Sequence, residues 1–488
     1  MLQSIDETLP PELWEMCCVY LPRTDLRSLT LTCTAFRWIA QPKLFDTLKI
    51  SVVPRAVILE GVQEDRTLQM PLTLSVARLR FFACERIRAS VQSCHLTVER
   101  SEREDGWVCL QDGTLEVMDE FLRSLPSFPN VSKVSFTSVM LDARELQCLG
   151  ELRSLKTLVL SDCRLIPSPT PPTALAIEHL QISGDPYRIF PPSKEGSSIG
   201  MLFDLTRLRT LNISRHTWGD ETSAAIFHVS SDITPFLNLT TLSIPSTSML
   251  SPSFPSLIAR CPRLHKLELL TFPKSTSHPY RPPPVVLSST MASHLEVFVG
   301  PDPCTPTFTS RALRKIVMTS GLELPYNIPE EIIRILSDVN SPSDLEDLTF
   351  GVYHITGSLL DCICDRFSSL KSLAMTIWTV DGDGFPEGVY TRKMLISQLP
   401  HHLPRTLIHL ELHTRFSCLE GSEDIQGEAL SAFIRALLGH CKCLQTFRIS
   451  FQGILGGILP VKSWIWERTM ENQHRWGGWE PLQITIQT

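Results

Sequence analysis

One six-residue phrase recurs along this chain and limits what it can fold into: an apolar residue, two others, an apolar residue, one other, and an apolar residue. The alternation at its end predicts a short strand with one buried face. A unit this small cannot bury that face alone, so the copies must stack on one another. Clear copies begin at Leu155, Leu208, Leu239, Leu264, Leu345, Leu370, Leu407 and Leu444. Weaker copies begin at Val131, Ile177, Leu295 and Leu313.

The phrase resembles the strand segment of leucine-rich repeats. Helix-like stretches lie between the copies, at 253–259, 329–337, 358–367 and 427–438. The variable spacing, and the absence of the family's Asn/Cys position, depart from the regular pattern. The resemblance implies an α/β fold: an irregular leucine-rich-repeat solenoid, or horseshoe, over 131–460. Residues 49–130 are expected to hold degenerate first repeats, with strands at 48–52 and 95–98 and a helical stretch at 77–91.

The C-terminal segment, residues 461–488, is rich in tryptophan, with Trp464, Trp466, Trp476 and Trp479 close together. It is interpreted as a cap that shields the last repeat, and the alternative is a tail that contacts a substrate.

The first 48 residues read as a separate helical module. Pro10 and Pro11 open a helix whose apolar residues at 13, 16, 17 and 20 share one face. Leu21-Pro22 ends it, Thr24 or Asp25 can cap a second helix, and Thr34 can cap a third. Three helices of about ten residues each cannot hide this much apolar surface among themselves. Four apolar residues also fall off the main stripes, so a second face must dock on the repeats or on a partner: Trp14, Val19, Leu31 and Trp38.

The same segment resembles the F-box motif. The matching residues are Leu9-Pro10, Leu21-Pro22, Asp25-Leu26, the stretch from Leu29 to Cys33, and Phe36-Arg37-Trp38-Ile39-Ala40. Thr32 and Phe36 stand where the family favours Val and Trp. The resemblance implies binding to the Skp adaptor and, through it, to the cullin and RING subunits of a ubiquitin ligase. It also implies that six residues form the adaptor interface or the core beneath it: Leu9, Pro10, Leu13, Leu21, Leu26 and Phe36.

Composition and motifs exclude several other classes of protein. The net charge of −7 provides no basic field for nucleic acid. The acidic start does not resemble a signal peptide, and no apolar run reaches the length of a membrane span. The 15 cysteines are scattered through apolar patterns, which is typical of free thiols in a reducing compartment. A cytoplasmic or nuclear protein is therefore expected. No phosphate loop or nucleophile elbow occurs, so neither an enzyme nor a cofactor is expected.

The outward side chains of the strands form the expected binding face, because repeat proteins usually bind there. The favoured contacts with a protein substrate are Thr157, Asn212, Lys266, Glu268, His409, Glu411, His413 and Arg448. A zinc site at His409, Glu411 and His413, with His401 or His402 nearby in sequence, is the alternative for that cluster, and an ordinary polar face is favoured over it. The sequence thus predicts a substrate receptor of a Skp–cullin–F-box ligase. The alternative is a non-degradative F-box and leucine-rich-repeat scaffold for protein–protein interaction.

Overall fold

The computed structural model describes residues 10–52, 72–98, 112–165, 174–184, 202–214, 235–270, 287–288, 291–319, 328–378, 399–416, 427–455, 457–458 and 462–467. The chain divides into two compact units, Met1–Leu239 and Thr240–Thr488, each considered by itself below. In the described part of the chain, no helix combines the length and the apolar character that a membrane span requires.

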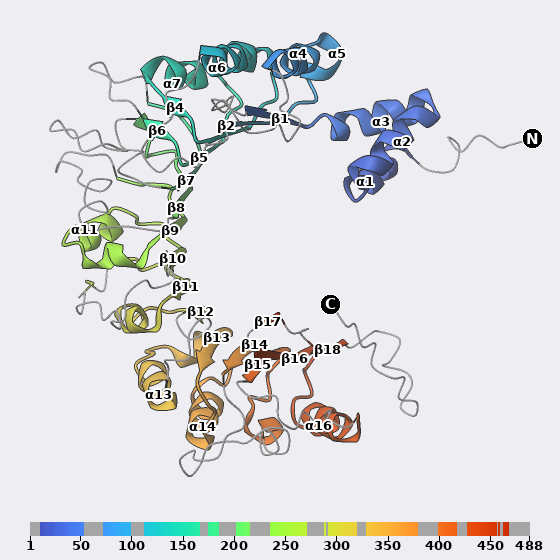
Figure 1. Ribbon diagram of the computed structural model, residues 1–488. Coiled ribbons are helices and arrows are strands. Elements are labelled where there is room, and N and C mark those ends of the chain that lie inside the picture. The colour runs from blue at the N-terminus through green and yellow to red at the C-terminus, as the bar shows by residue number, and fades with distance from the viewer. Residues whose placement is uncertain are drawn as a thin grey trace, which may run out of the picture. The chain divides into compact units, whose positions relative to one another are not determined.

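Unit 1 begins with three short helices, α1 (Pro11–Val19), α2 (Arg23–Thr32) and α3 (Thr34–Leu44), seen as a separate cluster in Figure 1. The second helix starts two or three residues earlier than a cap at Thr24 or Asp25 predicts, and the third starts one residue earlier than expected. Pro22 rather than Thr24 stands at the N-cap of α2, because its fixed φ already suits the turn into a helix. Cys33 rather than Thr34 caps α3. The three helices meet around a small core of Cys18, Leu26 and Ala40.

Most of the described strands after the module in unit 1 form a parallel sheet, in which they follow one another in chain order. Each strand pairs in register with the next, as expected for stacked repeats. The strands are β1 (Thr47–Val52), β2 (Ser93–Val98), β3 (Lys133–Thr137), β5 (Thr157–Ser161), β7 (His179–Ser183) and β8 (Thr210–Ser214). A second, two-stranded sheet pairs β4 (Met140–Leu141) with β6 (Arg164–Leu165).

Helices fill the connections between the first strands, on one side of the sheet (Figure 1). They are α4 (Leu72–Phe82), α5 (Glu85–Arg88), α6 (Asp112–Ser124) and α7 (Ala143–Gly150). The helix expected at 77–91 is therefore two helices. The break falls at Cys84, whose extended backbone forms the N-cap of α5.

The described part of unit 2 repeats the same construction, with eight parallel strands in chain order. They are β9 (Thr241–Pro245), β10 (Lys266–Leu270), β11 (Val297–Gly300), β12 (Lys315–Met318), β13 (Asp347–Val352), β14 (Ser372–Ile377), β15 (His409–Phe416) and β16 (Thr446–Leu455). The main connecting helices are α11 (Phe254–Ala259), α13 (Pro329–Ser337), α14 (Gly357–Arg366) and α16 (Gly427–His440).

The last described strands of unit 2 are antiparallel, unlike the strands before them. Both β17 (Gly457–Ile458) and β18 (Lys462–Glu467) pair antiparallel with β16. The segment expected to be a cap or tail therefore contributes a strand that includes Trp464 and Trp466. Trp476 and Trp479 lie outside the described residues.

A repeated hydrogen-bond pattern fixes the register from repeat to repeat. The residue just before a strand accepts two backbone N–H groups from the next repeat. The Glu346 carbonyl accepts from Lys371 and Ser372 at 2.8 and 2.9 Å, and the Lys371 carbonyl accepts from Ile408 and His409 at 2.7 and 2.9 Å. The phrase leucines lie beneath these strands, fully buried. Strand order, register and burial together make each unit a leucine-rich-repeat-like α/β solenoid.

Candidate protein-interaction surfaces

The three-helix module leaves several large apolar side chains exposed. Ten large apolar side chains are exposed in the described part of the chain, and six of them belong to α1–α3 or the turn after α1. They are Leu13, Met16, Val19, Tyr20, Leu31 and Trp38. Tyr20 is 86% exposed, and Leu31 and Trp38 are each 80% exposed. Apolar side chains this exposed favour burial against another molecule, at about 25 cal/mol for each Å² covered.

The apolar stripe of α1 faces outward. Met16, Cys17 and Tyr20 share that face and are exposed, whereas the neighbouring Cys18 is the residue that enters the module core. Burial accordingly raises the pKa of the Cys18 thiol. Trp14 is half-buried because its ring meets Phe36 edge-on, with centroids 4.8 Å apart. The helical spacing in the sequence predicted the apolar stripe of α1 but did not indicate whether the stripe faces the module core or solvent.

The six residues carried over from the F-box resemblance therefore divide into groups. Pro10 and Leu13 are exposed, Leu21 and Phe36 are half-buried, and Leu26 is buried in the module core. Leu9 lies outside the described residues. Of the five described residues, Pro10 and Leu13 are the exposed ones.

The outward face of unit 1 carries mainly polar side chains. Thr157 and Asn212 both project from this face and are half-buried, but they stand on β5 and β8, two strands apart and in different rows.

Sequence reasoning missed a group on the first strands of unit 1, where His95 on β2 lies in register with Lys49 on β1 and is influenced by Lys133 on β3. Burial, followed by the charges of Lys133 and Lys49, lowers the pKa of His95. The alternation of apolar and polar residues at 48–52 and 95–98 could have indicated that Lys49 and His95 point to the same face of the sheet.

The outward face of unit 2 carries paired charges around an apolar centre. Lys266 and Glu268 form an ion pair on β10 at 3.1 Å, which brings two expected contact residues together. Lys315 and Asp347 pair across β12 and β13 at 2.7 Å. In the row beside Lys315 and Asp347, which runs from Glu268 on β10 to Glu411 on β15, the register places four half-buried and mostly apolar residues: Val299, Val317, Thr349 and Ala374.

The expected cluster on β15 does form, as a set of hydrogen-bonded pairs. His413 Nε2 lies 3.0 Å from Glu411 Oε1, and Arg448 Nη1 lies 3.3 Å from the same oxygen. His413 Nδ1 also contacts Ser450 Oγ at 2.5 Å, and His409 Nδ1 contacts Thr446 Oγ1 at 2.7 Å. Each imidazole therefore has a neutral hydroxyl partner on β16.

The zinc alternative finds no support in this geometry. His402 pairs with Asp361 on α14 at 2.8 Å, and the ring of His401 lies against His440 on α16. Neither side chain joins His409 and His413. Within the described ranges, no group of three or more His, Cys, Asp or Glu side chains is arranged to hold a metal ion. The cluster is a hydrogen-bonded, polar part of the outward face.

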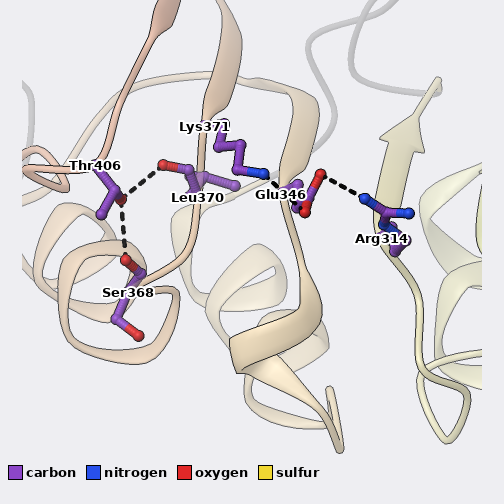
Figure 2. Close-up of polar contacts among 6 residues, drawn as sticks. All are labelled: Arg314, Glu346, Ser368, Leu370, Lys371 and Thr406. Atoms are coloured by element: carbon purple, nitrogen blue, oxygen red, sulfur yellow. Dashed lines mark hydrogen bonds and ion pairs between the residues drawn. The ribbon is translucent and has the colours of Figure 1, made fainter. Parts of the chain in front are cut away.

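An edge of unit 2 carries a second polar arrangement that sequence reasoning did not identify. Arg314 and Lys371 both hold Glu346, at 3.0 and 2.9 Å, and these contacts join three successive repeats (Figure 2). The hydrogen bonds from Lys371 and Arg314 lower the pKa of Glu346. Next to them, Thr406 Oγ1 bonds the carbonyls of Ser368 and Leu370 at 2.9 and 2.8 Å. A hollow of about 500 Å³ opens beside the ion triad. Because Glu346 pairs with a residue of the repeat on either side, the triad links the three repeats.

Comparison with known proteins adds little to this description. No family model matches the chain, and no curated protein matches it. Among solved structures, 118 chains match. One is the crystal structure of an internalin from Listeria monocytogenes, with 11% identity, a TM-score of 0.27, and coverage of 84% of this chain and 92% of that chain. The strand order and register described above carry the fold assignment.

Proposed function

We propose that this protein is the substrate-recognition subunit of a Skp–cullin–F-box ubiquitin ligase, in the cytoplasm, the nucleus or both. The exposed apolar face of α1–α3 carries the proposal. The module keeps a core of its own and still presents six large apolar side chains to solvent. A helical adaptor would bury them, and the F-box-like order of residues from Leu9 to Ala40 favours the Skp adaptor as that partner.

The outward faces of the strands would hold the target protein. In unit 2, an apolar row is bordered by the Lys266–Glu268 pair on one side and the Glu411–Arg448 pair on the other. An apolar centre within a polar border is the usual composition of a protein interface. The chain itself would do no bond chemistry. It would raise the effective concentration of its target near the ubiquitin-charged enzyme.

Titration of the full chain with the Skp adaptor tests the proposal. We expect the double variant Leu31→Ala/Trp38→Ala to bind at least about a hundredfold more weakly, since exposed aromatic anchors dominate such interfaces. Ile328→Ala in unit 2 is the matched control, because this exposed apolar side chain lies far along the chain from the module. Equal affinities for the double variant and the control would contradict an adaptor interface on this face.

Co-purification of the cullin distinguishes the ligase from the scaffold alternative. A ligase receptor should bring the cullin and RING subunits down with the adaptor, and its target should accumulate when the receptor is deleted. Adaptor binding without the cullin, and with an unchanged target level, would favour the non-degradative scaffold.

A further inference from the structure

A second apolar stripe lies on α4, the first helix after β1. Leu74 and Phe81 are 48% and 51% exposed, and Ala77 between them is also exposed. These three residues are spaced i, i+3 and i+7, so they share one helix face. A neighbouring face of the helix enters the core through Leu79 and Phe82, which are 0% and 6% exposed. The helix is therefore anchored on one side and apolar on the other.

This stripe continues the exposed face of the three-helix module. The Phe81 ring lies edge-on to Phe45, with centroids 5.8 Å apart, and Phe45 is the C-cap of α3. Phe45 follows Trp38 by seven residues, two helical turns, so the two share one side of α3. Trp38, Phe45, Phe81 and Leu74 thus form one line of apolar side chains from the module onto α4.

We propose that the partner that covers the three-helix face also covers the stripe on α4, and that this partner is the Skp adaptor. The inference rests on the proposed function. Continuity of the two surfaces supports a single occupant. So does their composition, because α1–α4 and the turn after α1 hold eight of the ten exposed large apolar side chains among the described residues.

One partner that touches both elements would fix the module against the repeats. Only Phe45 and Asp46 separate α3 from β1. Asp46 forms an exposed ion pair with Arg23 at 3.9 Å, which contributes little. An adaptor seated on Trp38 and Phe81 together would hold this joint in one orientation. That orientation sets where a bound target stands relative to the rest of the ligase.

Adaptor titration of the full chain by calorimetry tests the inference. The test variant is Leu74→Ser/Phe81→Ser. The control is Leu237→Ser/Ile328→Ser, which removes two apolar side chains of similar exposure, 46% and 52%, from elsewhere. We expect about tenfold weaker adaptor binding for the test variant and less than twofold change for the control. Leu74→Ser alone, which leaves the Phe45–Phe81 contact intact, should weaken binding about threefold.

Hydrogen exchange gives a readout that needs no variant. Amides of Leu72–Phe82 in the unaltered protein should gain protection when the adaptor is added. If Leu31→Ala/Trp38→Ala loses binding while the α4 variants match the control and α4 gains no protection, this inference is wrong and the proposed function stands. If the unaltered chain binds no adaptor, both are wrong. A dimer in light scattering that the α4 variants abolish would assign the stripe to a second copy of the chain and overturn the inference.

Discussion

At the scale of single residues, Cys33 is the N-cap of α3, although a thiol is a weak hydrogen-bond acceptor. Its sulfur accepts the Phe36 amide at 3.5 Å as the N-cap of α3, and its side chain is exposed. Oxygen caps are shorter and stronger. We expect Cys33→Ser to stabilise the module by about 0.5–1 kcal/mol, whereas Cys33→Ala should not stabilise it. Thermal unfolding followed by circular dichroism measures both, and a destabilised serine variant would contradict the capping role.

Glu145 is a residue whose shifted pKa makes stability depend on pH. It reaches back to the backbone of Asp142, whose carboxylate caps α7 by accepting the amides of Arg144 and Glu145. Burial, then the Asp142 carboxyl and the charge of Asp119, raises the pKa of Glu145 to about 7. The same contact with Glu145 lowers the pKa of Asp142, so the shared proton resides on Glu145.

The sign of the resulting pH dependence follows from this raised pKa. The native state holds the proton more tightly than the unfolded chain, where the pKa is about 4.3. The stabilisation is complete below about pH 4.3 and is lost as pH rises through 7. We expect Glu145→Gln, which keeps the capping oxygen, to be more stable than the unaltered protein at pH 8 and to lose less stability between pH 5 and 8. Parallel curves of melting temperature against pH for the two proteins would show that Glu145 ionises normally.

At the scale of elements, the repeated phrase predicts strands because its leucines must be buried. Leu348 on β13 is fully buried and lies in register with Ile316 and Leu373 on the neighbouring strands. We expect Leu348→Ala to cost about 2–5 kcal/mol, from lost burial and an unfilled cavity. Thr349→Ala, on the outward face of the same strand, should change stability by less than about 0.5 kcal/mol. Urea denaturation compares the two, and similar midpoints would mean that the faces of β13 are assigned the wrong way round.

The helices and contacts of unit 2 show what periodicity can and cannot predict. The helix expected at 329–337 matches α13, and that expected at 358–367 differs from α14 by one residue at each end. Periodicity suffices there because each helix buries a single stripe. It could not place Glu346 between Arg314 and Lys371, since repeat spacing varies and only the folded register brings three repeats together. The direction of the α1 stripe was equally out of reach, because an apolar face reads the same in sequence whether it meets a core or a partner.

At the scale of the whole molecule, the two candidate surfaces belong to different parts of the chain. The exposed apolar side chains that we propose to face the adaptor lie on α1–α4 in unit 1 and the turn after α1, and the polar face with the ion pairs described above lies on β10–β16 in unit 2. The module has a buried core of Cys18, Leu26 and Ala40, and the strands of unit 2 bury leucines of their own. Substitutions on one surface should therefore leave binding at the other unchanged.

Proximity labelling in cells tests this independence. We expect Leu31→Ala/Trp38→Ala to reduce labelling of the cullin and RING subunits at least about tenfold, while target proteins remain labelled within about twofold and accumulate. The complementary variant Glu411→Ala/Arg448→Ala removes the charged border of the unit 2 face and should leave cullin labelling intact while it reduces target labelling. If each variant lost both sets of proteins to the same extent and both variants remained folded, the two surfaces would form one binding site. The proposal that the module binds the adaptor while the repeats bind the target would then be wrong.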